Sequence, residues 1–155
     1  MIKANVITRN INWYKYIKNP DIYIGRKINK LNAKNKKLKN KEIFFTLLLS
    51  GEKEIKNLNR KFRKKNKSTD VLSFPFYVKK ELNKRLLKEK EIYLGDIIIN
   101  LSKIREKKNK KNFKIEFDNL WIHGLVHLFG HDHKKEKDYL EMQKIEKKYS
   151  SFING

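Results

Sequence analysis

Four stretches of the chain have the apolar pattern of β-strands: residues 2–8, 43–49, 71–74 and 92–100. The first alternates weakly between apolar and polar side chains. The second is almost continuously apolar, which predicts a strand covered on both faces. The third is stopped by Pro75, and the last contains Gly95, which is typical of a bulge or of a close approach between strands.

Apolar residues recur at helical spacing in four other stretches: residues 21–31, 52–65, 117–128 and a last segment after His133. We expect Asp21 to cap the first of these helices. Residues 33–41 are nearly all Lys and Asn and predict a loop, whereas residues 79–90 are charged and fit a loop or a helix. Because strands and helices alternate irregularly, the predicted fold class is α+β, a single domain over residues 1–155 with a mixed β-sheet packed with helices.

Composition narrows the classes of protein to consider. The chain has 155 residues, of which 39% are hydrophobic, and this is enough for a substantial core. No apolar run is long enough to span a membrane. The first residues lack the apolar stretch of a signal peptide, and there is no cysteine for a disulfide. A cytoplasmic protein of bacterial type is the simplest interpretation.

The formal net charge of +22 favours a polyanionic partner, because lysine and arginine bind phosphate backbones and release their counterions. The abundance of Lys, Asn and Ile is also what an AT-rich genome produces, so part of this charge needs no function. Arginine is scarcer and carries more information. Two of the six arginines, Arg60 and Arg63, lie within one four-residue stretch.

The four histidines of the chain cluster within eleven residues: His123, His127, His131 and His133. The first two are four residues apart, which places both imidazoles on one face of a helix. Three neutral imidazoles, with a fourth position left to water, form a catalytic zinc site. The spacing His-x3-His-x5-His is also that of the metzincin zinc site. The pattern therefore predicts one zinc ion per chain, bound at the end of a helix.

Two histidines compete for the place of third ligand. His131 continues the helical spacing from His127, whereas a helix that ends at Gly130 presents His133 instead. We expect the helix to end there, because glycine adopts a left-handed conformation without strain. The predicted ligands are His123, His127 and His133.

The residue after the first histidine bears on the reaction. Metzincin peptidases carry a glutamate there as general base, but this chain has Gly124. Asp96 or Asp132 could serve as a base instead. Gly124 counts against a peptidase and leaves phosphodiester hydrolysis as the first choice, because zinc activates water and polarises phosphoryl oxygens.

A second candidate site lies where the cation-rich end of helix 52–65 leads into the segment Ser68-Thr69-Asp70. A functional interpretation presents a guanidinium and neighbouring lysines to phosphate from a rigid junction. Taken alone, the stretch is more simply a helix end with solvated lysines. The candidate RNA contacts here are Arg60, Lys61, Lys64 and Lys65.

These stretches together resemble the signatures of the YbeY family of bacterial zinc-dependent endoribonucleases. The resemblance covers roughly residues 43 to 145 and rests on three blocks: residues 59–75, Leu94-Gly95-Asp96-Ile97 and residues 123–133. It implies that His123, His127 and His133 hold the zinc and that Arg63 is the active-site arginine. The chain departs from the family pattern at Phe62, Asn66, Ser68, Val126 and His131, and none of these departures removes a ligand or the arginine.

The resemblance also implies a function. By this resemblance the protein would be a single-strand-specific, metal-dependent endoribonuclease that acts in maturation of the 3′ end of 16S rRNA and in ribosome quality control. The partners would be RNA, chiefly rRNA and ribosomal particles, with ribosomal proteins as candidate partners, and a monomer is favoured. Two alternatives stay open. One is a zinc hydrolase acting on a substrate other than RNA, and the other is a non-catalytic RNA-binding ribosome assembly factor with structural zinc.

Overall fold

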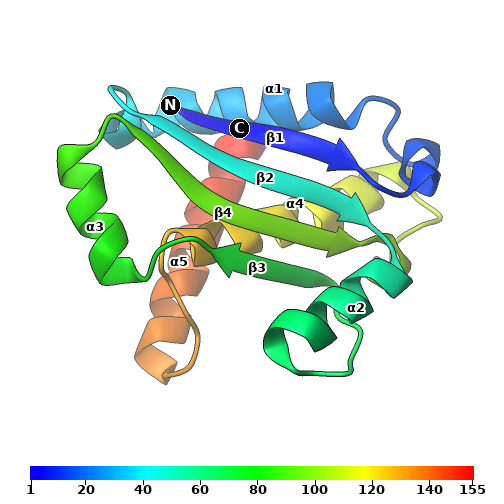
Figure 1. Cartoon of the computed structure of the whole chain (residues 1–155). Helices are drawn as coiled ribbons and strands as arrows, with labels where there is room; N and C mark the ends of the chain where they lie inside the picture. Colours follow the sequence, from blue (N-terminus) through cyan, green and yellow to red (C-terminus); the bar gives the residue numbers. More distant parts are fainter.

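The structure is built on a four-stranded mixed sheet. The computed structural model describes residues 1–155 and contains strands β1 (Ile2–Thr8), β2 (Glu42–Ser50), β3 (Val71–Pro75) and β4 (Glu91–Asn100). They pair in the order β1-β2-β4-β3 (Figure 1). The pairs β1–β2 and β2–β4 are parallel, whereas the edge strand β3 runs antiparallel to β4. All four predicted strands, and the mixed sheet, are confirmed.

Gly95 lies at an irregularity within β4, as its position predicted. Its φ is +137°, and a Cβ atom at this position would clash with the carbonyl oxygen of Phe74 on β3. The register of β4 against β2 shifts between Tyr93 and Asp96. Glycine is therefore required at this position for two reasons: it tolerates this φ, and it leaves room for the neighbouring backbone.

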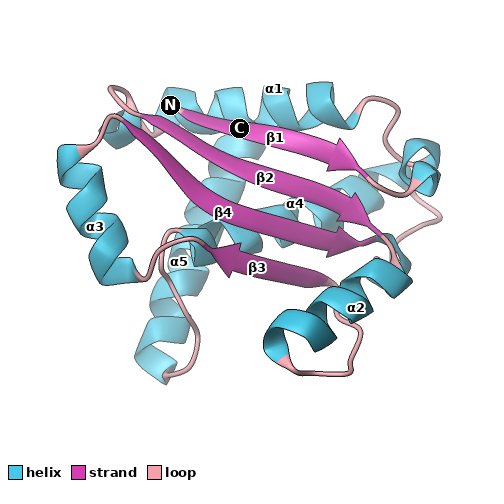
Figure 2. Ribbon diagram, viewed as in Figure 1, coloured by secondary structure: helices cyan, strands magenta, loops and turns pink.

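Five α-helices surround the sheet: α1 (Pro20–Lys34), α2 (Glu52–Arg63), α3 (Lys79–Lys88), α4 (Lys110–Leu128) and α5 (Glu136–Asn154). Helices α1, α4 and α5 lie behind one face of the sheet, whereas α2 lies on the other side near β3 and β4 (Figure 2). The predicted α+β class is thereby confirmed. None of the helices combines the length and the apolar composition needed to cross a membrane.

The main core lies between the sheet and helices α1, α4 and α5. Alternate residues of β2 point into it and are fully buried, namely Ile43, Phe45, Leu47 and Leu49. The residues between them are only half-buried, so the expectation that this strand is covered on both faces is wrong for most of its length. Only a small second cluster, Ile55, Leu72 and Ile98, fills the space beneath α2.

The helix that carries the histidines is longer than the sequence pattern predicted. It begins at Lys110, not at Phe117. Its N-cap is Asn109, whose side chain accepts hydrogen bonds from the backbone N–H groups of Lys111 and Asn112 at 2.9 and 3.2 Å. An asparagine cap of this kind satisfies backbone donors that the first helical turn leaves free. Phe113, in the added turns, is fully buried.

The ends of α1 also differ from the expectation. The helix begins at Pro20, and Asp21 lies in its first turn and is not the cap. Proline is favoured at this position because its missing N–H would have no partner there. The helix runs to Lys34 and is followed by a short 3₁₀ turn at residues 36–38, so residues 33–41 are not one continuous loop.

A buried carboxylate joins α1 to α4. Asp118 accepts hydrogen bonds from the Tyr23 hydroxyl and the Trp121 indole N–H, each at 2.9 Å, and pairs with the Lys27 ammonium at 3.2 Å. Burial first, and then the neighbouring carboxylate, raises the pKa of Tyr23 above its ordinary value, so this hydroxyl stays protonated and donates. The network fixes the position of α4 against α1.

Replacing this carboxylate should destabilise the protein strongly. Asp118→Ala leaves two buried donors and one ammonium without their acceptor, and we expect the free energy of unfolding to fall by about 3 kcal/mol. The control is Lys3→Ala, which breaks an exposed ion pair with Glu42 and should cost less than about 1 kcal/mol. Urea unfolding measures both, and equal losses would contradict a special role for Asp118.

Candidate metal centre

Three of the four histidines converge where α4 ends. His123 and His127 lie one turn apart on α4, and His133 follows the helix. One potential ligand atom from each lies within 4.8 Å of the other two. The Nε2 atoms of His123 and His127 are 3.2 Å apart, close to the roughly 3.3 Å that separates two ligands of a tetrahedral zinc ion with bonds of about 2.0–2.1 Å. The cluster is therefore capable of holding a metal ion.

Gly130 turns the chain so that His133 can join the cluster. Helix α4 ends at Leu128, and Gly130 has a φ of +93°, as a helix-ending glycine does. The ring of His131 is not part of the cluster. Its backbone carbonyl instead accepts a hydrogen bond from Nδ1 of His127 at 2.9 Å. His131 thus contacts the centre through its main chain.

The second nitrogen of each helical histidine is held by a partner outside the cluster. Nδ1 of His123 donates to a carboxylate oxygen of Glu146 on α5 at 2.6 Å, and the carbonyl of His131 holds Nδ1 of His127. Such partners fix the tautomer and ring orientation, and leave Nε2 free for a metal. Glu146 was not predicted from the sequence. Its one signal is helical spacing, four residues after the buried Met142.

Electrostatics keep one ligand candidate in the form that metals bind. Burial, followed by the proximity of His123, lowers the pKa of His127 below its ordinary value. Its imidazole is therefore neutral at pH 7, and only a neutral imidazole has a lone pair to give to a metal. The donor set, three imidazole nitrogens without thiolate or carboxylate, suits zinc with an open position.

Arg63 lies in the same cavity as the three histidines. This cavity, of about 850 Å³, lies at the junction of α2, β3 and the end of α4. The Arg63 guanidinium donates a hydrogen bond from Nη2 to the carbonyl oxygen of Ser73 at 2.7 Å. It also lies over the ring of Phe74, with 5.7 Å between the guanidinium carbon and the ring centroid. The edge strand β3 thereby holds the arginine beside the metal centre.

The other predicted cations are distributed differently. Lys65 lines the cavity together with Arg63, whereas Arg60, Lys61 and Lys64 do not. Arg60 bonds to Asn57 on its own helix at 3.4 Å. Lys64 has a left-handed backbone, with φ of 54°, and ends α2. Arg60 and Lys61 are separated from Arg63 by their positions around α2, whereas Lys64 turns the chain only before Lys65.

The two carboxylates suggested as a general base lie in different places. Asp132 lines the cavity, whereas Asp96 does not. Asp96 lies on β4 and accepts a hydrogen bond from the Tyr93 hydroxyl. A second carboxylate in the cavity, Asp70 at the start of β3, was not considered as a base from the sequence. It accepts a hydrogen bond from the backbone N–H of Val71 at 2.8 Å.

Gly124 is required by packing. It lies between the two helical histidines, where α4 contacts β4, and a Cβ atom there would lie 2.7 Å from Cγ2 of Ile97. A glutamate at this position would have to enter the packed space between helix and sheet. The structure therefore gives a physical reason why the catalytic glutamate of metzincin peptidases is missing.

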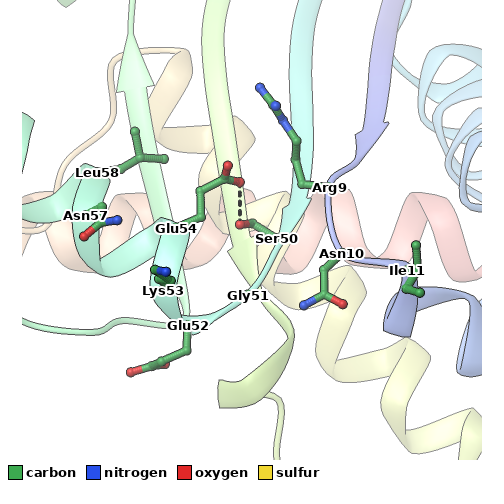
Figure 3. A pocket seen from close by; sticks show the side chains of 10 residues that line it. All are labelled: Arg9, Asn10, Ile11, Ser50, Gly51, Glu52, Lys53, Glu54, Asn57 and Leu58. Carbon is green, nitrogen blue, oxygen red and sulfur yellow. Dashed lines mark hydrogen bonds between the residues drawn. The ribbon is translucent and has the colours of Figure 1, made fainter.

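A second hollow, of about 670 Å³, lies at the other end of α2 and is lined by residues 9–11, 50–54, 57 and 58 (Figure 3). It contains none of the residues predicted to be functional. Two carboxylates, Glu52 and Glu54, stand at its helix N-terminus, and Glu54 accepts a hydrogen bond from the Ser50 hydroxyl at 2.6 Å. These carboxylates already occupy the position that an anion would take.

The fold and the cavity define a class: small α+β proteins with a centre of three histidines that can hold a metal ion, and an arginine beside it. A profile of the family described as Endoribonuclease YbeY matches residues 15–154. The Endoribonuclease YbeY of Pelagibacter ubique is 42% identical over 155 residues, which cover 99% of this chain and 97% of that protein. The chain belongs to the YbeY family of endoribonucleases.

Other comparisons agree with this assignment. The Endoribonuclease YbeY of Ehrlichia canis is 34% identical over 148 residues, 94% of this chain and 88% of that protein. The solution structure of TM1509 from Thermotoga maritima superposes with a TM-score of 0.60 at 25% identity, covering 97% of this chain and 89% of that one. The resemblance inferred from the sequence motifs is confirmed.

The choice between the two late histidines can be tested directly. Because the His133 ring belongs to the cluster and the His131 ring does not, His131→Asn should bind zinc like the parent. His133→Asn should bind at least about a hundredfold more weakly, because even loss of an outer partner of a ligand costs 10–100-fold. Zinc titration with elemental analysis after dialysis measures this. Retention of zinc by His133→Asn and its loss from His131→Asn would refute the assignment.

Proposed function

We propose that this protein is a zinc-dependent endoribonuclease that hydrolyses phosphodiester bonds in single-stranded RNA. The proposed substrate is rRNA, in maturation of the 3′ end of 16S rRNA and in ribosome quality control. The observation that carries the proposal is the shared cavity of the three histidines and Arg63, in a chain of the YbeY family. The net charge of +22 suits a polyanionic substrate.

In this proposal, His123, His127 and His133 hold one zinc ion per chain through imidazole nitrogens. When bound, the ion lowers the pKa of a coordinated water to about 7 and polarises a phosphoryl oxygen. Glu146 and the carbonyl of His131 keep two of the imidazoles in the required orientation. Asp70 and Asp132 are the carboxylates of the cavity and are candidates for the general base.

Arg63 would stabilise charge on the phosphate that is attacked. One of its N–H groups is bound by the Ser73 carbonyl, and a guanidinium has five N–H donors in a rigid fork, so others can face the phosphate. A donor fixed in advance costs no reorganisation when negative charge develops. Lys65, in the same cavity, would contact the RNA backbone, with Arg60, Lys61 and Lys64 as further contacts outside it.

The proposed partners are ribosomal particles, with ribosomal proteins as candidate contacts, and the proposed location is the cytoplasm, where rRNA matures. We propose a monomer; the three histidines and the arginine all come from one chain, so the proposed chemistry needs no second copy. Neither alternative raised by the sequence gains an observation in its favour. The glycine at position 124 removes the base of a zinc peptidase, and the cavity beside the histidines leaves room for a substrate.

The proposal is tested by incubating zinc-loaded protein with an rRNA fragment that contains both paired and unpaired segments. We expect cleavage within unpaired segments, loss of cleavage in His127→Ala, which lacks one ligand, and no cleavage of casein in parallel. Gel analysis of end-labelled RNA measures the result. Cleavage by His127→Ala at the parent rate would point to a contaminating nuclease. A parent protein that leaves the RNA intact but cleaves casein would overturn the proposal.

Replacing Arg63 distinguishes a role in catalysis from a role in RNA binding. If its guanidinium acts mainly in the transition state, Arg63→Ala should cleave about 10²–10³-fold more slowly, as when an oxyanion donor is removed. Its affinity for RNA should change little, because many lysines share the phosphate contacts. Lys56→Ala, which removes an exposed cation from the same helix, is the matched control. Single-turnover cleavage and filter binding at one salt concentration give both quantities. An equal loss of binding and cleavage in Arg63→Ala would reduce Arg63 to part of a basic surface.

A further inference from the structure

An exposed phenylalanine lines the same cavity as the metal centre. Phe76 follows β3 directly, and 66% of its surface is exposed. Single exposed apolar side chains are ordinary on a protein surface, but neighbouring ones that line one cavity are a candidate binding surface. Its neighbour Val78, also in the cavity wall, is 75% exposed. Phe76 and Val78 thus line the same cavity as the three histidines, and most of their surface is exposed.

The backbone and the neighbouring rings hold Phe76 in place. Its N–H donates to the carbonyl oxygen of Leu94 at 2.8 Å, which extends the pairing of β3 with β4 by one residue. The rings of Tyr77 and Tyr93 contact it in T-shaped geometry, with centroids 5.2 and 6.0 Å away. No ring is stacked on Phe76 in parallel. A planar ligand could therefore stack on a ring whose position is already fixed.

Two other aromatic rings near the cavity, those of Tyr77 and Phe74, are already engaged by cations. The guanidinium of Arg85 lies 4.4 Å from the centroid of Tyr77. The guanidinium of Arg63 lies over Phe74. Phe76 has no cation over its ring, although four cationic side chains line the cavity: Arg63, Lys65, Lys79 and Lys134. These outnumber its two carboxylates.

We propose that Phe76 is a stacking platform for an unpaired base of the RNA, next to the phosphate that is cleaved. This rests on the proposed function. Cations alone would bind paired and unpaired RNA alike, because both present phosphates. A flat ring adds a contact that only a base free of its own stack can make, and such stacking tolerates any base. The charge of the cavity favours this occupant over an apolar peptide.

Phe76→Trp offers a direct signal of stacking. The two natural tryptophans, Trp13 and Trp121, are fully buried, so an indole introduced at the surface dominates any change caused by a ligand. We expect a hydrolysis-resistant phosphorothioate oligouridylate to quench this indole. A matching ribose-phosphate oligomer without bases should not. Quenching by both oligomers alike would show that only the backbone is near the ring, and would overturn the proposal.

Affinity and cleavage complete the test, using zinc-loaded protein. Phe76→Ala and Phe76→Leu should bind the oligouridylate between about fivefold and a hundredfold more weakly than the parent, because neither has an aromatic face. Both should bind the oligomer without bases as the parent does. Leu87→Ala, at a still more exposed apolar residue outside the cavity, is the control and should change neither affinity.

The outcomes separate this proposal from the proposed function. If the parent cleaves RNA and Phe76→Ala binds and cleaves as the parent does, the stacking platform is wrong and the endoribonuclease stands. Full affinity in Phe76→Leu would show an apolar docking surface instead, and equal weakening toward both oligomers would show a general structural effect. Either result overturns the platform. A parent that neither binds nor cleaves RNA overturns both proposals.

Discussion

A helix can approach a sheet only as closely as the side chain of the residue at their point of contact allows. In this protein that residue is Gly124, whose missing side chain lets α4 lie directly against Ile97 of β4. The contact lies one residue after His123 and three residues before His127, so it sets the depth at which both imidazoles stand. The same requirement for a small residue excludes a glutamate from this position. One packing contact therefore both positions the two helical histidines and excludes the glutamate of a metzincin peptidase.

The edge strand β3 connects the parts of the cavity that lie on opposite sides of the sheet. Helix α2 packs on one face and α4 on the other, and Ser73 touches both. Its carbonyl oxygen accepts from Arg63 at the end of α2, and its hydroxyl donates to the carbonyl of Gly124 on α4 at 3.4 Å. Because β3 is the edge strand and has no further strand beyond it, Arg63 and the three histidines can line one cavity although α2 and α4 lie on opposite faces of the sheet.

The features that could be predicted from the sequence are those that depend on residues close to one another along the chain. The histidine cluster spans eleven residues, and the spacing of its members with Gly130 was enough to expect the convergence that the structure shows. Glu146 lies on another helix, and no local pattern connects it to His123. The cations from Arg60 to Lys65 look alike in sequence, but only Arg63 and Lys65 line the cavity, and only the fold shows this.

The order of the elements along the chain has a consequence for how the protein is made. All four strands are complete by residue 100, whereas α4 and α5, which cover the inner face of the sheet, come after it. A nascent chain therefore contains every strand before it contains the helices that bury them, and an exposed apolar sheet face invites aggregation. The lysines that fill the early segments repel those of neighbouring chains. Much of the positive charge can thus protect growing polypeptides on a crowded polysome, whatever it later contributes in the finished protein.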